Sequence, residues 1–119
     1  MACTVTVRQA DQVTIVDLCG RMTLGEGADT VREAVRNLIH RGESRILLNL
    51  QDVTYIDSAG LGELVGSYAT ITNRGGQIKL LNAHSKVEDV LRATKLYGIF
   101  ENFTEEEAAV RSFAGRATA

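Results

Sequence analysis

Apolar, β-branched positions in the first twenty residues fall into two runs that a short polar joint separates. Residues 4–9 read TVTVRQ and residues 13–19 read VTIVDLC, a composition that favours extended structure. The three residues between the runs, ADQ, are polar and few enough to close a hairpin. The chain is therefore expected to begin with two antiparallel strands.

From Ala28 the apolar positions change to the spacing of a helix face, and charged residues occupy the opposite face. This helix is expected to end near Gly42, because glycine readily adopts the left-handed conformation that closes helices. The next run, RILLNL at residues 45–50, is almost continuously apolar, which is typical of a central strand covered on both faces. The apolar face of the helix comprises Ala28, Val31, Ala34, Val35, Leu38 and Ile39.

The second half of the chain continues this alternation of helix and strand. A helix is predicted over residues 58–74, where apolar positions recur at helical spacing and two glycines follow. QIKLLN at residues 77–82 then predicts a strand. SKVE at residues 85–88 has the Ser-x-x-Glu spacing of a capping box, which predicts a third helix with Ser85 as its N-cap.

The order of these elements predicts the fold class. A short strand is expected at residues 99–100, and TEEE at residues 104–107 opens a final helix with acidic residues that favour the helix dipole. Residues 114–119 are expected to be a flexible tail. Alternating strands and helices imply parallel strand pairs joined by right-handed crossovers. The prediction is an α/β fold: one domain over residues 1–119, with a mixed, mostly parallel sheet, an N-terminal antiparallel hairpin and about four helices.

Composition limits the classes of function. The 119 residues are 45% hydrophobic and 24% charged, as in an ordinary globular protein. The formal net charge of −2 provides no basic surplus for the nucleic-acid backbone. No apolar stretch approaches the roughly 18 residues that cross a bilayer. Neither nucleic acid nor membrane is therefore expected as a partner.

The two cysteines, Cys3 and Cys19, lie far apart in the sequence without a second pair of ligands nearby, so that a zinc site is not expected. Cys19 is expected to be a buried core thiol. The opening MACTVTVRQ lacks the basic-then-apolar pattern of a secretory signal. These features favour a reduced, cytoplasmic protein without metal or cofactor.

The stretch YIDSAGLGELVGSY, at residues 55–68, contains the most distinctive chemistry of the chain, because a serine precedes three glycines. Gly60, Gly62 and Gly66 lie between a predicted strand and a predicted helix, as in a dinucleotide site. The third glycine comes one residue too late for the Gly-x-Gly-x-x-Gly spacing. A nicotinamide or flavin site is therefore not favoured.

A serine nucleophile is the second interpretation of Ser58. The nucleophile elbow of hydrolases needs Gly-x-Ser-x-Gly, and here Gly60 is in place but Ile56 occupies the first glycine position. A triad would also need a histidine base, for which His40 and His84 are the candidates. Both stand at predicted helix ends, where histidine is more often a surface residue. An enzyme is not the favoured interpretation.

Helix capping is the simplest structural role for the same stretch. Asp57 and Ser58 are both strong N-cap residue types, and either could accept a hydrogen bond from a free backbone N–H. Gly60 and Gly62 would each cost a helix roughly 1 kcal/mol relative to alanine. This cost indicates that something approaches the backbone closely at the first turn.

Four segments carry a resemblance to a known family. VTYIDSAGLGELV, at residues 53–65, resembles the signature of STAS domains, and specifically of the anti-sigma factor antagonists of bacterial partner-switching systems. VTIVDLCGRMTLGEG resembles the second strand and following turn of that family, RILLNL its central strand, and GQIKLLN the strand ahead of its third helix. The resemblance spans residues 4–113, the expected core of the domain.

The resemblance implies that Ser58 is a regulatory phosphoacceptor and that the protein is not an enzyme. In such antagonists the unphosphorylated form binds an anti-sigma factor that is also a serine kinase, and this binding frees the sigma factor. Phosphorylation of the serine blocks binding, and a serine phosphatase reverses it. The alternative is a non-phosphorylated STAS scaffold or subunit, of stressosome or lipid-transport type, in which Ser58 only caps the helix.

The resemblance also assigns neighbouring residues. Many such antagonists have an aspartate where Thr23 stands in this chain, in the turn expected to contact the partner. Leu61, by contrast, is of a type that packs a core more often than it contacts a partner. The expected surround of the phosphosite is Asp57, Ala59, Gly60, Leu61 and Gly62, and the expected partner-binding residues are Thr23, Leu24 and Gly25.

Overall fold

The computed structural model describes residues 3–95 and 98–114 and contains a five-stranded sheet. The strands lie in the order in which they occur along the chain, β1-β2-β3-β4-β5. β1 pairs with β2 antiparallel, and the remaining pairs are parallel. The predicted mixed sheet with an antiparallel opening hairpin is confirmed. The strands are β1 (Cys3–Ala10), β2 (Val13–Met22), β3 (Arg45–Ile56), β4 (Gln77–Leu81) and β5 (Asn102–Phe103).

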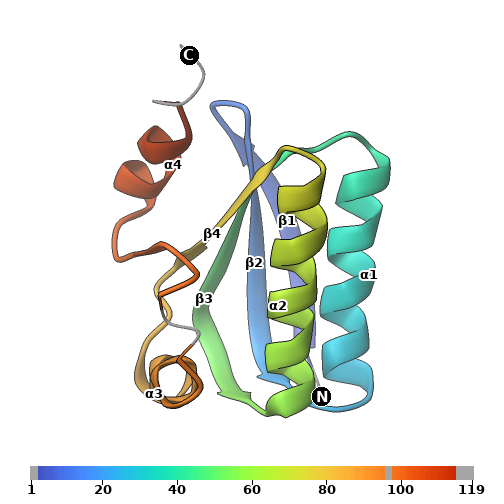
Figure 1. Cartoon of the computed structure of the whole chain (residues 1–119), viewed down its shortest axis with the longest axis vertical. Coiled ribbons are helices and arrows are strands. Elements are labelled where there is room, and N and C mark those ends of the chain that lie inside the picture. Colours follow the sequence, from blue (N-terminus) through green and yellow to red (C-terminus); the bar gives the residue numbers. More distant parts are fainter. Residues whose placement is uncertain (1–2, 96–97, 115–119) are drawn as a thin grey trace.

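Four helices connect and cover these strands: α1 (Glu26–His40), α2 (Ser58–Asn73), α3 (Ser85–Ala93) and α4 (Glu106–Ala114). Figure 1 shows α1 and α2 side by side and running in the same direction, with α4 set apart at the other side of the strands. As predicted, α1 and α2 end before glycines with positive φ, 83° at Gly42 and 81° at Gly75. None of the described helices is both long and apolar enough to cross a lipid bilayer.

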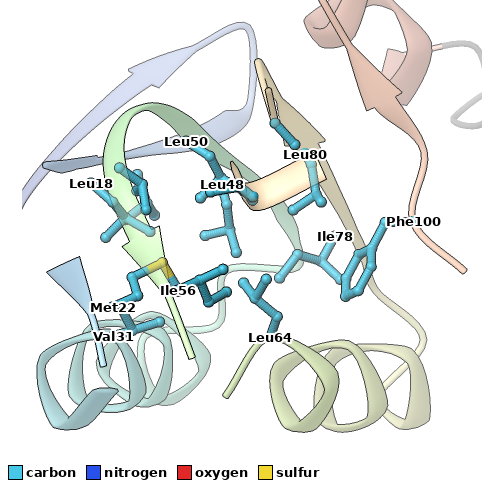
Figure 2. Close-up of a cluster of buried hydrophobic side chains, with 14 of the residues drawn as sticks. Leu18, Met22, Val31, Leu48, Leu50, Ile56, Leu64, Ile78, Leu80 and Phe100 are labelled. Atoms are coloured by element: carbon cyan, nitrogen blue, oxygen red, sulfur yellow. The ribbon is translucent and has the colours of Figure 1, made fainter. Parts of the chain in front are cut away.

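The hydrophobic core occupies both faces of the sheet. The larger cluster packs between the strands and α1, α2 and α3, and Figure 2 shows side chains of this cluster filling the space between strands and helices. The smaller cluster joins Val13, Ile15 and Leu47 to Val110 and Phe113 of α4. Because successive residues of a strand point to opposite faces, Ile46 and Leu48 belong to the first cluster and Leu47 to the second.

β3 is central, as its apolar run predicted, but it is longer than expected. The strand continues beyond residues 45–50 to Ile56, and Val53 and Ile56 remain buried in the larger cluster. The strand therefore ends two residues before Ser58. Its last residue, Ile56, is buried, and the first turn of α2 follows after Asp57.

Three local predictions were wrong. The fifth strand is Asn102–Phe103 rather than residues 99–100, because Phe100 is buried in the larger cluster instead of pairing with β4. α3 begins at Ser85, so that His84 and not Ser85 occupies the N-cap position. Cys19 is exposed, whereas Cys3 is buried.

Candidate functional site

Ser58 is the first residue of α2, and its side chain is exposed. Ile56, at the end of β3, is buried, and Asp57 between them adopts the extended backbone conformation of an N-cap, with φ −113° and ψ −172°. In the part of the chain that the structure describes, the Ser58 hydroxyl has no hydrogen-bond partner. The serine is therefore presented to solvent at a rigid junction of strand and helix.

Asp57, rather than Ser58, caps α2. Its Oδ1 accepts a hydrogen bond from the backbone N–H of Gly60 at 3.0 Å. The two residue types were equally suitable by sequence, and the geometry decides between them. Because the capping role is filled, the hydroxyl of Ser58 is not needed for the stability of the helix.

The second carboxylate oxygen of Asp57 holds the turn between β2 and α1. Its Oδ2 accepts a hydrogen bond from the backbone N–H of Leu24 at 3.0 Å. The backbone N–H donors of Leu24 and Gly60 hold the pKa of the Asp57 carboxyl below its ordinary value. One ionised side chain thus ties the start of α2 to a turn that lies more than thirty residues earlier in the chain.

The predicted partner-binding residues Thr23, Leu24 and Gly25 therefore lie beside Ser58. Leu24 is 81% exposed, while its backbone N–H is held by the hydrogen bond to Asp57. Gly25 is the N-cap of α1 and has a φ of 96°, a conformation that disfavours other residues. Thr23 is half-buried, and its carbonyl oxygen accepts a hydrogen bond from the N–H of Ala28.

The two glycines of the first turn of α2 have different roles. A Cβ on Gly60 would clash with the carbonyl oxygen of Met22 at the end of β2, whereas a Cβ on Gly62 would meet nothing within 4 Å. The close approach inferred at Gly60 is therefore internal to the fold. Gly62 is exposed, so its bare backbone is available to a partner.

The remaining residues of the predicted surround divide between surface and core. Leu61 is only 8% exposed and packs in the larger core cluster with Leu64, as expected for apolar residues at this spacing. Ala59 is half-buried. Of the predicted surround, Gly62 is thus the exposed residue, and Leu24 of the neighbouring turn is exposed as well.

Neither histidine is placed to activate Ser58. The Nε2 of His84 lies 2.7 Å from the carbonyl oxygen of Gln51, and His40 is in the last turn of α1, at the opposite end of the helix pair from Ser58. Within residues 3–95 and 98–114, no group of three or more His, Cys, Asp or Glu residues could hold a metal ion. The described residues around the serine do not form a catalytic triad.

The sequence reasoning did not identify Tyr55, three residues before Ser58. Tyr55 is 42% exposed, and two cations face its ring: the Arg21 guanidinium at 5.8 Å and the Lys86 Nζ at 6.0 Å from the ring centroid. The only sequence signal was an aromatic residue at a strand position next to Ile56, whose side chain points into the core.

Comparison with protein families gives a match over nearly the whole chain. A family model described as the STAS domain matches residues 4–109. The anti-sigma-B factor antagonist of Bacillus subtilis (strain 168) is 29% identical over 107 residues, which cover 90% of this chain and 96% of that protein. The family match therefore includes β2 to β5, β1 from its second residue onward, and both segments of the candidate site.

Solved structures show the same fold at lower sequence identity. An anti-sigma factor antagonist from Mycobacterium paratuberculosis superposes with a TM-score of 0.82 at 18% identity and covers 95% of each chain. The Bacillus cell fate determinant SpoIIAA in its phosphorylated form gives a TM-score of 0.72 at 19% identity, covering 92% of this chain and 98% of that one. At such identities the likeness concerns the fold.

Proposed function

Because the chain belongs to the STAS domain family, we propose that it is an anti-sigma factor antagonist regulated by phosphorylation of Ser58. The unphosphorylated form binds an anti-sigma factor with serine kinase activity, and this binding frees the sigma factor. Phosphate transfer to Ser58 dissociates the complex, and a serine phosphatase restores the binding form. The name of the Bacillus subtilis relative supports the general role.

The proposal rests on one observation: Asp57 caps α2, and the side chain of Ser58 does not. Asp57 accepts the capping hydrogen bond from Gly60, and the exposed hydroxyl of Ser58 has no partner among the described residues. A hydroxyl that is not needed by the fold can be modified without loss of a structural contact. This is the arrangement that a reversible switch requires.

A phosphate on Ser58 would change the surface charge without disturbing the core. It adds about −1.5 to −2 charges at pH 7, and the N-terminus of α2 provides a positive dipole end that tolerates an anion. The ionised Asp57 beside it adds further negative charge. A partner surface that covers this end of α2 would then have to desolvate several adjacent negative charges, which is unfavourable. Phosphorylation is therefore expected to block association while the fold persists.

The partner surface is proposed to combine Ser58, Gly62 and the exposed side chain of Leu24. A large apolar residue on an anchored turn is suited to act as a binding anchor, because its ordering costs little on association. Gly62 offers bare backbone one helical turn from the serine, which leaves room for a kinase to bring its nucleotide close.

The first test is direct phosphorylation. The purified chain is incubated with ATP and soluble extract of its native host, and the intact mass and peptide map are measured. We expect one added phosphate of about 80 Da on Ser58, and Ser58→Ala should stay unmodified. If the host's sigma-regulator kinase is active in the same extract and the wild-type chain gains no mass, the scaffold interpretation replaces the switch.

The second test separates folding from binding. Ser58→Ala should retain partner affinity, whereas Ser58→Asp should weaken it about tenfold or more, because a fixed negative charge enters the interface. Circular dichroism should show both variants folded with similar thermal midpoints. Equal affinity of the two variants for the anti-sigma factor would contradict the proposal.

A further inference from the structure

A groove lies between α1 and α2 on the outer side of the helix pair, away from the sheet. Its volume is about 340 Å³, and the two helices that form its walls run parallel (Figure 1). The groove is hollow because α2 presents small residues there: Gly66, Ser67 and Thr70. Val35 and Ile39 of α1 supply apolar surface opposite them.

The charged residues of the groove are predominantly basic. Arg32 is already occupied, because it forms ion pairs with Asp29 at 2.7 Å and with Glu63 at 3.1 Å. The side chains of Arg36 and Arg74, which also line the groove, form no ion pair or hydrogen bond in the described part of the chain. Because the one positive charge of Arg32 is shared by Asp29 and Glu63, the arginines of the groove that have no acidic partner among the described residues are Arg36 and Arg74.

Helix electrostatics account for only part of this pattern. Arg74 is the C-cap of α2, and a cation at a helix C-terminus is favoured by the dipole. Arg36 does not fit this explanation, because it stands a full turn before the end of α1, where the dipole effect has fallen off.

We propose that this groove binds an acidic peptide segment of a partner protein. Arg36 of α1 and Arg74 of α2 line the groove from its two walls. An acidic segment that lies along the groove can bring one carboxylate to each of these guanidinium groups. The apolar surface of Val35 and Ile39 contacts the aliphatic or small residues between the acids.

The apolar part of the lining favours a peptide over a compact anion. A single phosphate would gain nothing from Val35 and Ile39, whereas the side chains between the acids of a peptide can cover them. The groove begins beside Glu63, five residues into α2, and this surface is therefore separate from the exposed hydroxyl of Ser58. The proposal does not depend on the phosphorylation switch.

The test is an NMR titration of the full chain, labelled with nitrogen-15, with a capped peptide of about 12 alternating Glu and Ala residues. We expect saturable shifts of the backbone amides of Arg36, Gly66, Thr70 and Arg74, and weakening of the binding as salt is raised. A Lys-Ala peptide of the same length should cause no such shifts. If inorganic phosphate alone shifts these amides as strongly as the Glu-Ala peptide does, the site is one for a small anion and the proposal is overturned.

Charge reversal supplies the matched control. The double variant R36E/R74E should lower the affinity for the Glu-Ala peptide about tenfold or more. R41E/R111E makes the same change at two exposed arginines that do not line the groove, and it should change the affinity by about twofold or less. Equal losses in the two double variants would show a non-specific charge effect and refute a built site, as would the absence of amide shifts in the wild-type groove.

Discussion

At the scale of single residues, Asp57 determines what Ser58 is free to do. One carboxylate oxygen caps α2 through Gly60 and the other anchors Leu24. The side chain thus organises the helix start and the exposed turn together, while the adjacent hydroxyl remains unused by the fold. A serine that accepts a phosphate and a serine that caps a helix cannot be told apart by sequence. Here they are distinguished by Asp57, which accepts the capping hydrogen bond in place of Ser58.

The variant Asp57→Asn tests this double role. An asparagine has one acceptor oxygen, so it can retain the capping bond from Gly60 but cannot also accept from Leu24. We expect faster hydrogen exchange of the Leu24 amide, little change at Gly60, and a small decrease in thermal midpoint. Asp52→Asn, at an exposed acid of β3, is the control. An unchanged exchange rate at Leu24 would argue that the turn is held by its own backbone.

At the scale of elements, the close approach of α2 to the end of β2 explains a glycine that looked functional. Gly60 has no room for a side chain because the Met22 carbonyl oxygen lies against it, and the N–H of Asp57 also donates to that oxygen at 3.3 Å. α1 is docked similarly, since a Cβ on Gly27 would clash with the carbonyl oxygen of Arg21. Both helices thus start close against the last residues of β2.

Alanine substitutions at the two glycines of the first turn should therefore change the free energy of unfolding in opposite directions. Gly60→Ala is expected to lower the free energy of unfolding by about 1–3 kcal/mol, because the clash is with backbone that cannot move freely. Gly62→Ala should raise it by up to about 1 kcal/mol through better helix propensity. Urea denaturation measures both. Destabilisation by Gly62→Ala would show that the open space beside it is filled.

At the scale of the whole molecule, α4 covers the second face of the sheet and is attached to it by charge as well as by its apolar residues. Arg8 of β1 bonds Asp17 of β2 at 2.6 Å and Glu106 of α4 at 2.7 Å. Lys79, only 5% exposed, lies under α4 with its Nζ 2.9 Å from the Ser112 hydroxyl oxygen. The ion pair between Arg8 and Glu106 and the buried side chain of Phe113 thus attach α4 to the sheet.

The Arg8 cluster makes stability depend on pH. Hydrogen bonds from Arg8 lower the pKa values of Asp17 and Glu106 below their ordinary range. A carboxyl with a lowered folded-state pKa contributes stability above its unfolded pKa, and loses it as pH falls through the folded value. The free energy of unfolding should therefore decrease as the pH is lowered below about 4.

Arg8→Met should flatten this acid dependence, because the two carboxyl groups would then titrate nearer their ordinary pKa values. At neutral pH the loss should be modest, since exposed ion pairs of this kind contribute about 0.2–1 kcal/mol each. Urea denaturation between about pH 3 and pH 7 measures the profile. The control is Arg111→Met, an exposed arginine of α4, which should leave the slope unchanged. Equal slopes in wild type and Arg8→Met would contradict the assignment.

Patterns of hydrophobic and polar residues over short stretches of the chain were sufficient to predict the architecture. Periodicity of 2 and of about 3.6 residues is set by local backbone geometry, and it predicted the opening hairpin, the central β3 and the glycine ends of α1 and α2. The predictions that failed concern single positions, such as Ser85, Cys19 and the fifth strand. The outcome at each of these positions depends on how its helix or strand packs against a distant part of the chain.

The sequence by itself determined the α/β order, the family resemblance and the place of Ser58 between a strand and a helix, because all three depend on residues adjacent in the chain. Only the tertiary structure decided that Asp57 caps α2, that Gly60 serves the packing of α2 on β2, and that Arg36 and Arg74 face one groove. Those facts depend on atoms from segments far apart in sequence. Their distances are fixed only when β2, β3 and the two helices have packed together.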